Sequence, residues 1–157
     1  MVRALEKVHR LIKPGGILID IHPSTHIASI EIRLRDRFVS AGWVHETDDY
    51  IEYEWADQAV AAAVDRGLFV LERSSTFSFV WYADTLADLQ KYLTEEWKDA
   101  FIDAVTFMRA EELMSGIEPD KEVLVRETIQ IARLIKYSTA SSTPPPTAHD
   151  LSDTVKQ

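Results

Sequence analysis

The sequence predicts an α/β domain, and three observations support this fold class. First, residues 5–21 have the pattern of a helix that turns directly into a short apolar strand. Second, residues 69–82 and 122–136 each alternate apolar and polar side chains over a long stretch, as extended strands do. Third, the segments between these strands carry apolar residues three and four positions apart, the spacing of helices that bury one side. Helices that alternate with strands along the chain predict an α/β fold.

The composition limits both the architecture and the partners. The chain has 157 residues, of which 46% are hydrophobic, enough for one domain with a buried core. Its 17 basic and 26 acidic side chains give a formal net charge of −9, so we expect neither nucleic acid nor a membrane as a partner. The absence of cysteine excludes disulfides, thiolate nucleophiles and cysteine–metal sites. Because there is no apolar run of about 18 residues and no signal-peptide core, the expected location is cytoplasmic.

The first helix and strand are the most clearly defined elements. The helix carries apolar residues on one side, at Leu5, Val8 and Ile12. It ends before Pro14, and the two glycines that follow allow a sharp reversal of the chain. Residues 17–21 form an apolar run interrupted only by Asp20, which predicts one strand of a parallel sheet with both faces covered.

A β-hairpin is expected after the first strand. Residues 30–35 alternate between apolar and charged side chains, the pattern of a strand with one buried face. Residues 38–44 are its expected partner strand. The turn between them, at Asp36 and Arg37, is weak because neither position is glycine, so the pattern leaves the register open.

Three further helices are expected. Residues 50–66 carry a helical apolar stripe, and Gly67 stands where a left-handed cap would end it. The side chains expected to cap its start are those of Thr47, Asp48 and Asp49. Another helix begins at Thr85, with Asp88 placed to complete a capping box. The third spans residues 99–114.

Two long strands and a tail complete the chain. In residues 69–82 one parity is apolar and predicts a single apolar face, made of Phe69, Leu71, Phe77, Phe79 and Trp81. In residues 122–136 the apolar parity is that of Val123, Val125, Ile129, Ile131 and Ile135. We expect residues 1–137 to form the domain and residues 138–157, rich in Ser, Thr and Pro, to be a disordered tail.

The helix, the Pro-Gly-Gly turn and the first strand resemble part of a known family. The run L-I-K-P-G-G-I-L-I-D, residues 11–20, resembles the late segment of class I S-adenosylmethionine-dependent methyltransferases, where a helix ending in a similar turn leads into the fifth strand. In that family a helix and two long antiparallel strands follow, and the later elements here have the same order. The resemblance implies the C-terminal part of a Rossmann-like methyltransferase sheet, with one parallel strand, a long antiparallel pair and a hairpin, flanked by helices.

The resemblance implies S-adenosylmethionine as methyl donor, yet the family's donor-binding motif is absent. That family holds the donor with a glycine-rich loop in its N-terminal half, whereas the five glycines here form no Gly-x-Gly. The resemblance therefore implies a truncated methyltransferase that supplies the substrate side for a small-molecule acceptor, beside a complementing N-terminal half. It does not predict activity of this chain by itself. The alternative is a non-catalytic domain that forms a homodimer through its exposed sheet or binds a small ligand.

Asp20 and His22 are the candidate catalytic residues. Both lie at the carboxyl end of the first strand, where open α/β sheets place their ligands. A histidine there can take a proton from an acceptor near neutral pH. The alternative is structural, with Asp20 bonded to a neighbouring loop and His22 a solvated turn residue.

Four aromatic or imidazole side chains are candidates for substrate binding. They fall beside the start of the helix of residues 50–66 and are Trp43, His45, Tyr50 and Tyr53. Amphipathic rings at this point suit a pocket for a small organic acceptor, and core packing is the alternative use of such rings. The spacing of the histidines matches no metal-ligand pattern, so we expect no metal.

Overall fold

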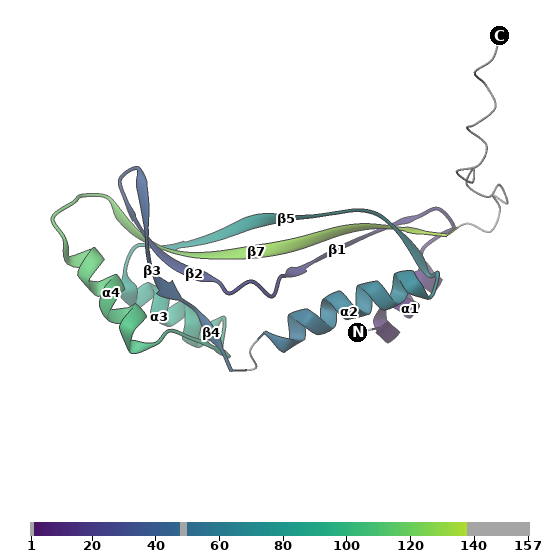
Figure 1. The fold of residues 1–157 in the computed structure, drawn as a ribbon, viewed down its shortest axis with the longest axis horizontal. Coiled ribbons are helices and arrows are strands. Elements are labelled where there is room, and N and C mark those ends of the chain that lie inside the picture. The colour runs from purple at the N-terminus through teal and green to yellow at the C-terminus, as the bar shows by residue number, and fades with distance from the viewer. Residues whose placement is uncertain (1, 48–49, 138–157) are drawn as a thin grey trace, which may run out of the picture.

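The protein, seen here in a computed structural model that describes residues 2–47 and 50–137, has an α/β fold whose main sheet is antiparallel (Figure 1). The helices of the described part are α1 (Val2–Leu11), α2 (Ile51–Asp65), α3 (Leu86–Glu95) and α4 (Ala104–Ser115). The strands are β1 (Ile17–Pro23), β2 (Ser29–Leu34), β3 (Arg37–Trp43), β4 (His45–Glu46), β5 (Phe69–Ala83), β6 (Ala100–Phe101) and β7 (Lys121–Lys136).

The long strand β7 is the centre of the main sheet. Strand β5 pairs with it along one side, while β1 and β2 divide its other side between them. Strand β3 pairs with β2 as the second arm of a hairpin, and β4 forms a separate short ladder with β6. Figure 1 shows β5 and β7 as one long twisted ribbon to which the shorter strands attach. Every pairing in the main sheet is antiparallel.

Strand β1 forms where the sequence predicts a strand, but the expectation of a parallel, fully covered strand was wrong. Its described neighbour is β7, which runs antiparallel to it. Ile17, Ile19 and Ile21 are 48%, 48% and 58% exposed, because none of the described elements packs over that face of β1. An apolar run indicates burial, but it does not show which neighbours provide it.

The helices form two groups at opposite ends of β7. At one end α3 and α4 cover a core that includes Ile32, Val123 and Val125. At the other end α1 and α2 cover a smaller core of Ala63, Phe69 and Leu134. Since Leu134 and Val123 have opposite parity, the two groups cover opposite faces of the strand. The twist of the ribbon brings both groups below the sheet in Figure 1.

The hairpin of β2 and β3 confirms the predicted strand pair and shifts its turn by one residue. Leu34 pairs with Arg37, so the turn residues are Arg35 and Asp36 rather than Asp36 and Arg37. Arg35 adopts a φ of 54°, the left-handed conformation that two-residue hairpin turns require. No glycine marks this position, which is why the sequence left the register open.

A β-bulge in β5 overturns the prediction of one apolar face. Leu71 pairs with Leu134 and Arg73 with Arg133, so Glu72 is the extra residue. Because of the bulge, odd-numbered residues before it and odd-numbered residues after it lie on opposite faces of the sheet. Phe69 therefore faces the α1 and α2 side, whereas Phe77, Phe79 and Trp81 face the other way.

The predicted helices are present, and the last of them starts later than predicted. Thr85 caps α3 by accepting a hydrogen bond from the Asp88 amide at 3.1 Å, as the capping box predicts. The fourth helix starts later than predicted, at Ala104, because the residues before it form β6 and Asp103 provides the cap. Gly67 has the expected left-handed φ of 68° after α2.

Some expectations fall on parts of the chain that are not described. Residues 48–49, expected to cap α2, and the tail of residues 138–157 lie outside the described residues. Thr47, the other expected cap, donates its hydroxyl to the Asp99 carbonyl instead. Among the described helices, none is long and apolar enough to cross a membrane.

Candidate functional site

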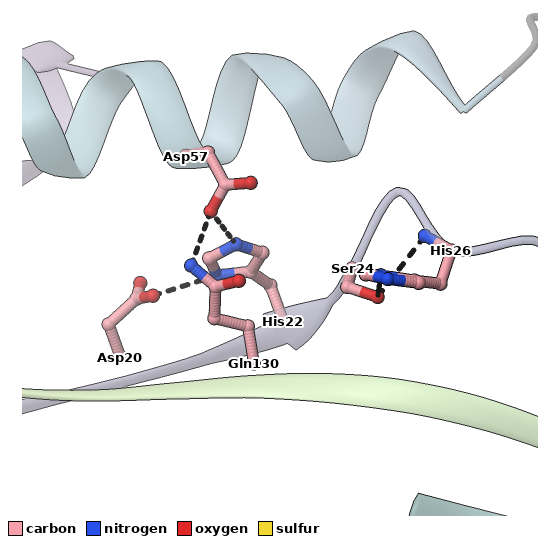
Figure 2. Close-up of polar contacts among 6 residues, drawn as sticks. All are labelled: Asp20, His22, Ser24, His26, Asp57 and Gln130. Carbon is pink, nitrogen blue, oxygen red and sulfur yellow. Dashed lines mark hydrogen bonds and ion pairs between the residues drawn. The ribbon is translucent and has the colours of Figure 1, made fainter. Parts of the chain in front are cut away.

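His22 lies between two carboxylates at the carboxyl end of β1 (Figure 2). Its Nδ1 is 2.7 Å from Oδ2 of Asp20, and its Nε2 is 3.0 Å from Oδ1 of Asp57. The side chain of His22 is 10% exposed, whereas those of Asp20 and Asp57 are 20% and 37% exposed. The ring is therefore held at both nitrogens, while the carboxylate of Asp57 keeps access to solvent.

This geometry fixes how many hydrogens the three groups share. An ionised carboxylate only accepts hydrogen bonds, so each ring nitrogen that faces one must carry a hydrogen. Both contacts are made when His22 is an imidazolium, or when Asp57 holds the hydrogen that the neutral ring lacks. The cluster of Asp20, His22 and Asp57 can thus hold one proton beyond two carboxylates and a neutral imidazole.

The side chains of this site come from three elements. Asp20 and His22 are two residues apart on β1, so they share the face that α2 covers. Gln130 stands directly opposite His22 on β7. It donates from Nε2 to Oδ1 of Asp57 at 2.6 Å, the same oxygen that contacts the histidine. Asp57 on α2 is thereby tied to the sheet from two strands (Figure 2).

A cavity of about 810 Å³ opens beside His22. Its walls come from α2, from the start of α1 and from the end of β1. The lining residues used below are His22, Glu52, Tyr53 and Trp55. The floor is made of small side chains, Ala56, Ala59 and Ala62. A cavity of this volume, mostly apolar with a few polar groups, is typical of small-molecule sites.

The structure brings together only part of the predicted substrate-binding set. Tyr53 lines the cavity beside His22 and donates its hydroxyl to Glu46 at 2.8 Å. Tyr50 is buried and donates its hydroxyl to the Val44 carbonyl at 2.6 Å, an arrangement that serves the core. Tyr50 therefore packs in the core, which was the alternative to substrate binding for these aromatic residues.

Trp43 and His45 line a different hollow, of about 460 Å³, together with residues of the loop after β1. The imidazole of His45 stacks on the ring of Phe101 with centroids 5.4 Å apart. Its Nε2 is 3.7 Å from a carboxylate oxygen of Asp103. These two predicted residues therefore do not share the cavity of His22.

The loop after β1 is closed by a serine and a second histidine. Ser24 is buried, and its Oγ is 3.1 Å from Nδ1 of His26. The same oxygen accepts the His26 amide at 3.2 Å (Figure 2). Both contacts span two residues, the pattern of a serine that stabilises a tight turn. We assign this pair to the shape of the loop.

Glu127 and Glu46 form a second acidic pair, near Tyr92 of α3. Burial and the charge of Glu46 raise the pKa of Glu127. Glu46 itself is buried and accepts hydrogen bonds from Tyr53 and from Trp97 Nε1, the latter at 2.7 Å. The pair connects the cavity wall at Tyr53 to the core beneath α3.

Sequence reasoning missed Asp57 and Gln130. Gln130 had a signal in the sequence, since it interrupts an apolar strand as Asp20 does, and two such interruptions predict polar partners within the sheet. The pairing of β1 with β7 was needed to show that His22 and Gln130 face each other. Asp57 had only its place on a helix, and helix position alone does not identify a contact.

The described residues do not fit the donor that the family resemblance implies. Gly15 and Gly67 serve turns after helices with open space around them. Gly42 has no room for a ligand because Thr106 packs against it. None of the described glycines forms a loop between a strand and a helix that could hold S-adenosylmethionine. Among these residues there is also no group of His, Asp and Glu that could hold a metal ion.

Comparisons with known proteins add no relative. No protein-family model matches the chain. No curated protein and no solved structure matches it either.

Proposed function

We propose that this chain supplies the acceptor-binding side of a methyl-transfer reaction, with the S-adenosylmethionine site on another polypeptide or another part of the protein. The observation that carries the proposal is the cluster of His22, Asp20 and Asp57 at the wall of the 810 Å³ cavity. A proton-accepting group beside an apolar cavity is what a small hydroxyl or amine acceptor requires.

The resemblance at residues 11–20 supports the choice of reaction, and the topology is compatible with it. The turn after α1 leads into a strand that carries the site, as in the family. A helix and a long antiparallel pair, β5 and β7, come later in the chain. The Rossmann-like part of this proposal requires that further strands join the free side of β1.

The proton step involves residues of this chain only. With the shared hydrogen on Asp57, an acceptor X–H in the cavity would displace the Asp57 carboxyl group from the unprotonated Nε2 of His22 and donate its proton to that nitrogen. The donor held elsewhere would supply the methyl group, with cleavage of its carbon–sulfur bond and release of S-adenosylhomocysteine. Asp20 keeps its hydrogen bond to Nδ1, so the ring stays oriented and its positive charge is balanced. Gln130 retains Asp57 near its original place, which allows it to return.

The charges around the cavity select the class of acceptor. Glu52 lines the wall, and no lysine or arginine is among the lining residues. Trp55 is 54% exposed and offers an aromatic face to a ring or a cation. A neutral or cationic aromatic acceptor suits this wall, whereas an anionic acceptor is disfavoured.

The first experiment compares tyramine with 4-hydroxyphenylacetate, two phenols that differ in the sign of their charge. We expect tyramine to shift the NMR signals of His22 and Trp55 and the carboxylate analogue to leave them unchanged. The E52Q variant should weaken tyramine binding, while D65N, at the other end of the same helix and outside the cavity lining, should not. Shifts confined to Trp43 and His45, or none with either phenol, would contradict the assignment of the acceptor site.

The second experiment is calorimetric titration of the folded chain with S-adenosylhomocysteine. Since the described residues hold no donor site, we expect no heat of binding. Micromolar binding would contradict the division of the two sites between separate parts.

A non-catalytic ligand-binding domain is the second candidate, because Asp57 occupies the nitrogen that must accept the proton. In that case tyramine would bind while the His22 ring nitrogens keep their signals. A change in those signals on binding favours the proton-accepting role.

A further inference from the structure

Strand β1 has a free edge, whose backbone amide and carbonyl groups can pair with another strand. Strand β1 is the last strand of the sheet on its side, with β7 its only partner among the described strands. Lys136 donates its amide to the Gly16 carbonyl, and Ser24 donates its amide to the Thr128 carbonyl, both at 2.8 Å. The even-numbered residues of β1 therefore bond to β7. In an antiparallel ladder the residues between them point their amide and carbonyl groups away from that partner.

The groups that point outward belong to Ile17, Ile19 and Ile21. The same three side chains form the exposed apolar face of β1. Pro23, the next outward residue, has no amide hydrogen and ends the run of donors. The edge thus offers three consecutive bonding positions with apolar side chains and no charge among them.

The start of the β5 edge carries features that prevent strand addition, and the edge of β1 lacks them. It carries the Glu72 bulge, and Arg73 follows directly. Bulges and charged side chains are the devices by which proteins protect exposed edges from further pairing. The outward residues of β1 have neither a bulge nor a charge, and all three are isoleucines, whereas β5 after its bulge is rich in serine and threonine, so the β1 edge offers an apolar site for a partner strand.

We propose that a second copy of the chain pairs with this edge, antiparallel to β1 and related by a two-fold axis at Ile19. This register places Ile19 opposite Ile19 of the second copy and Ile17 opposite its Ile21. Every outward amide of the three isoleucines then finds a carbonyl. The inference does not depend on methyl transfer.

Electrostatics and hydrogen bonding favour this register over the two that are shifted toward the carboxyl end of β1. An axis at Asp20 would set the two Asp20 carboxylates directly opposite each other, and like charges in that position are destabilising. An axis at Ile21 would place Pro23 opposite Ile19 and lose a donor. With the axis at Ile19, Asp20 faces Leu18 of the second copy, and no like charges are opposed.

The register also brings the second copy to the candidate site. His22 comes to lie opposite Gly16 of the second copy, in the turn between α1 and β1. The chain reversal there approaches the cavity that His22 and Pro23 line. Each copy therefore supplies backbone beside the cavity of the other.

Cysteine cross-linking tests the register, because the natural chain has no cysteine. In a bonded antiparallel pair, facing Cα atoms are about 5.5 Å apart, within the range that disulfides span. We expect I19C chains to form covalent dimers on mild oxidation. The matched control is I17C, whose copies would lie about 13 Å apart along the strands at about 3.3 Å per residue. Equal cross-linking of I17C and I19C would overturn the register.

The mass in solution tests the dimer without cysteine. We expect the natural chain to have twice its 17.9 kDa mass by light scattering, and the I19D variant to be a folded monomer. Phe77 is exposed on the same face of the sheet but on β5, so F77D should stay dimeric. A natural chain that is monomeric at all concentrations, or a dimer lost in F77D but kept in I19D, would overturn the proposal.

Discussion

The two ends of β7 differ sharply in how they are covered. At residues 123–125 the strand is fully buried on both faces, by the core beneath α3 and α4 on one side and neighbouring side chains on the other. At residues 131–135 one face is covered by α1, α2 and the small core around Phe69, while the other face, which carries Ile131, Arg133 and Ile135, is partly or fully exposed. We call residues 123–125 with α3 and α4 the packed end of β7, and residues 131–135 with α1 and α2 the bare end.

This difference separates stability from function along a single strand. The packed end holds the larger of the two buried apolar cores. The bare end holds the His22 cluster, the 810 Å³ cavity and the unpaired edge of β1. The packed end therefore anchors the sheet, and the bare end presents surfaces to other molecules.

Truncation of matched isoleucines gives the largest expected contrast between the ends. Ile32 is fully buried at the packed end, so I32A should lower the free energy of unfolding by about 2–5 kcal/mol. Ile21 is more than half exposed, so I21A should cost less than about 1 kcal/mol in the monomer. Denaturant titration measures both. Equal losses would show that the bare end is as well packed as the other.

The ion pair of Glu31 and Arg126 stabilises the packed end in a pH-dependent way. Arg126 donates from Nε and from a terminal nitrogen to the two carboxylate oxygens, at 2.9 and 2.8 Å. These bonds lower the pKa of Glu31. The stabilisation is therefore present above the ordinary pKa of a glutamate and lost as the pH falls through the lowered value.

The E31Q variant measures this contribution. It should lose about 1–2 kcal/mol at neutral pH, a value reduced because Arg126 is partly exposed. The gap between E31Q and the natural chain should close in acid. A constant gap down to strongly acidic pH would contradict the pair's role.

Glu127 gives the smallest expected effect, with the opposite sign. Its pKa is raised by burial and by Glu46, so the folded state favours its protonated form. The stability this provides is present below the ordinary pKa and lost as the pH rises through the raised value. E127Q should therefore increase stability at neutral pH, by less than about 1 kcal/mol. Thermal melts of E127Q and the natural chain at neutral and acidic pH provide the measurement.

Much of the fold could be predicted because local patterns decide local elements. The stripe of α1, the capping box at Thr85 and the alternation in β7 each depend on residues close in sequence. The bulge at Glu72 could not be predicted, since a bulge is fixed by the partner strand. The antiparallel neighbour of β1 was missed for the same reason, because β7 lies more than a hundred residues later.

The candidate site shows the same division. Asp20 and His22 were found because polar residues at the end of an apolar strand stand out. Trp43 and His45 were expected beside Tyr53 from nearness in sequence, and the structure places them in a separate hollow. Asp57 is 35 residues from His22, so only the fold could reveal that contact.

The dimer and the complementing half compete for one edge of the sheet. A strand that extends the sheet for methyl transfer would use the same outward amides of β1 that a second copy uses. Addition of a complementing half should therefore convert dimers into mixed pairs rather than build on them. The free edge of β1 is the central feature in both cases.

Residue-resolved amide hydrogen exchange on β1 at several protein concentrations tests that edge most directly. The amides of Leu18 and Asp20 bond to β7 and should exchange slowly at every concentration. The Ile19 amide points outward and should be protected at high concentration and lose its protection on dilution. Fast exchange of Ile19 at every concentration would contradict pairing with a second copy. Concentration-independent protection would assign the edge to another segment of the same chain.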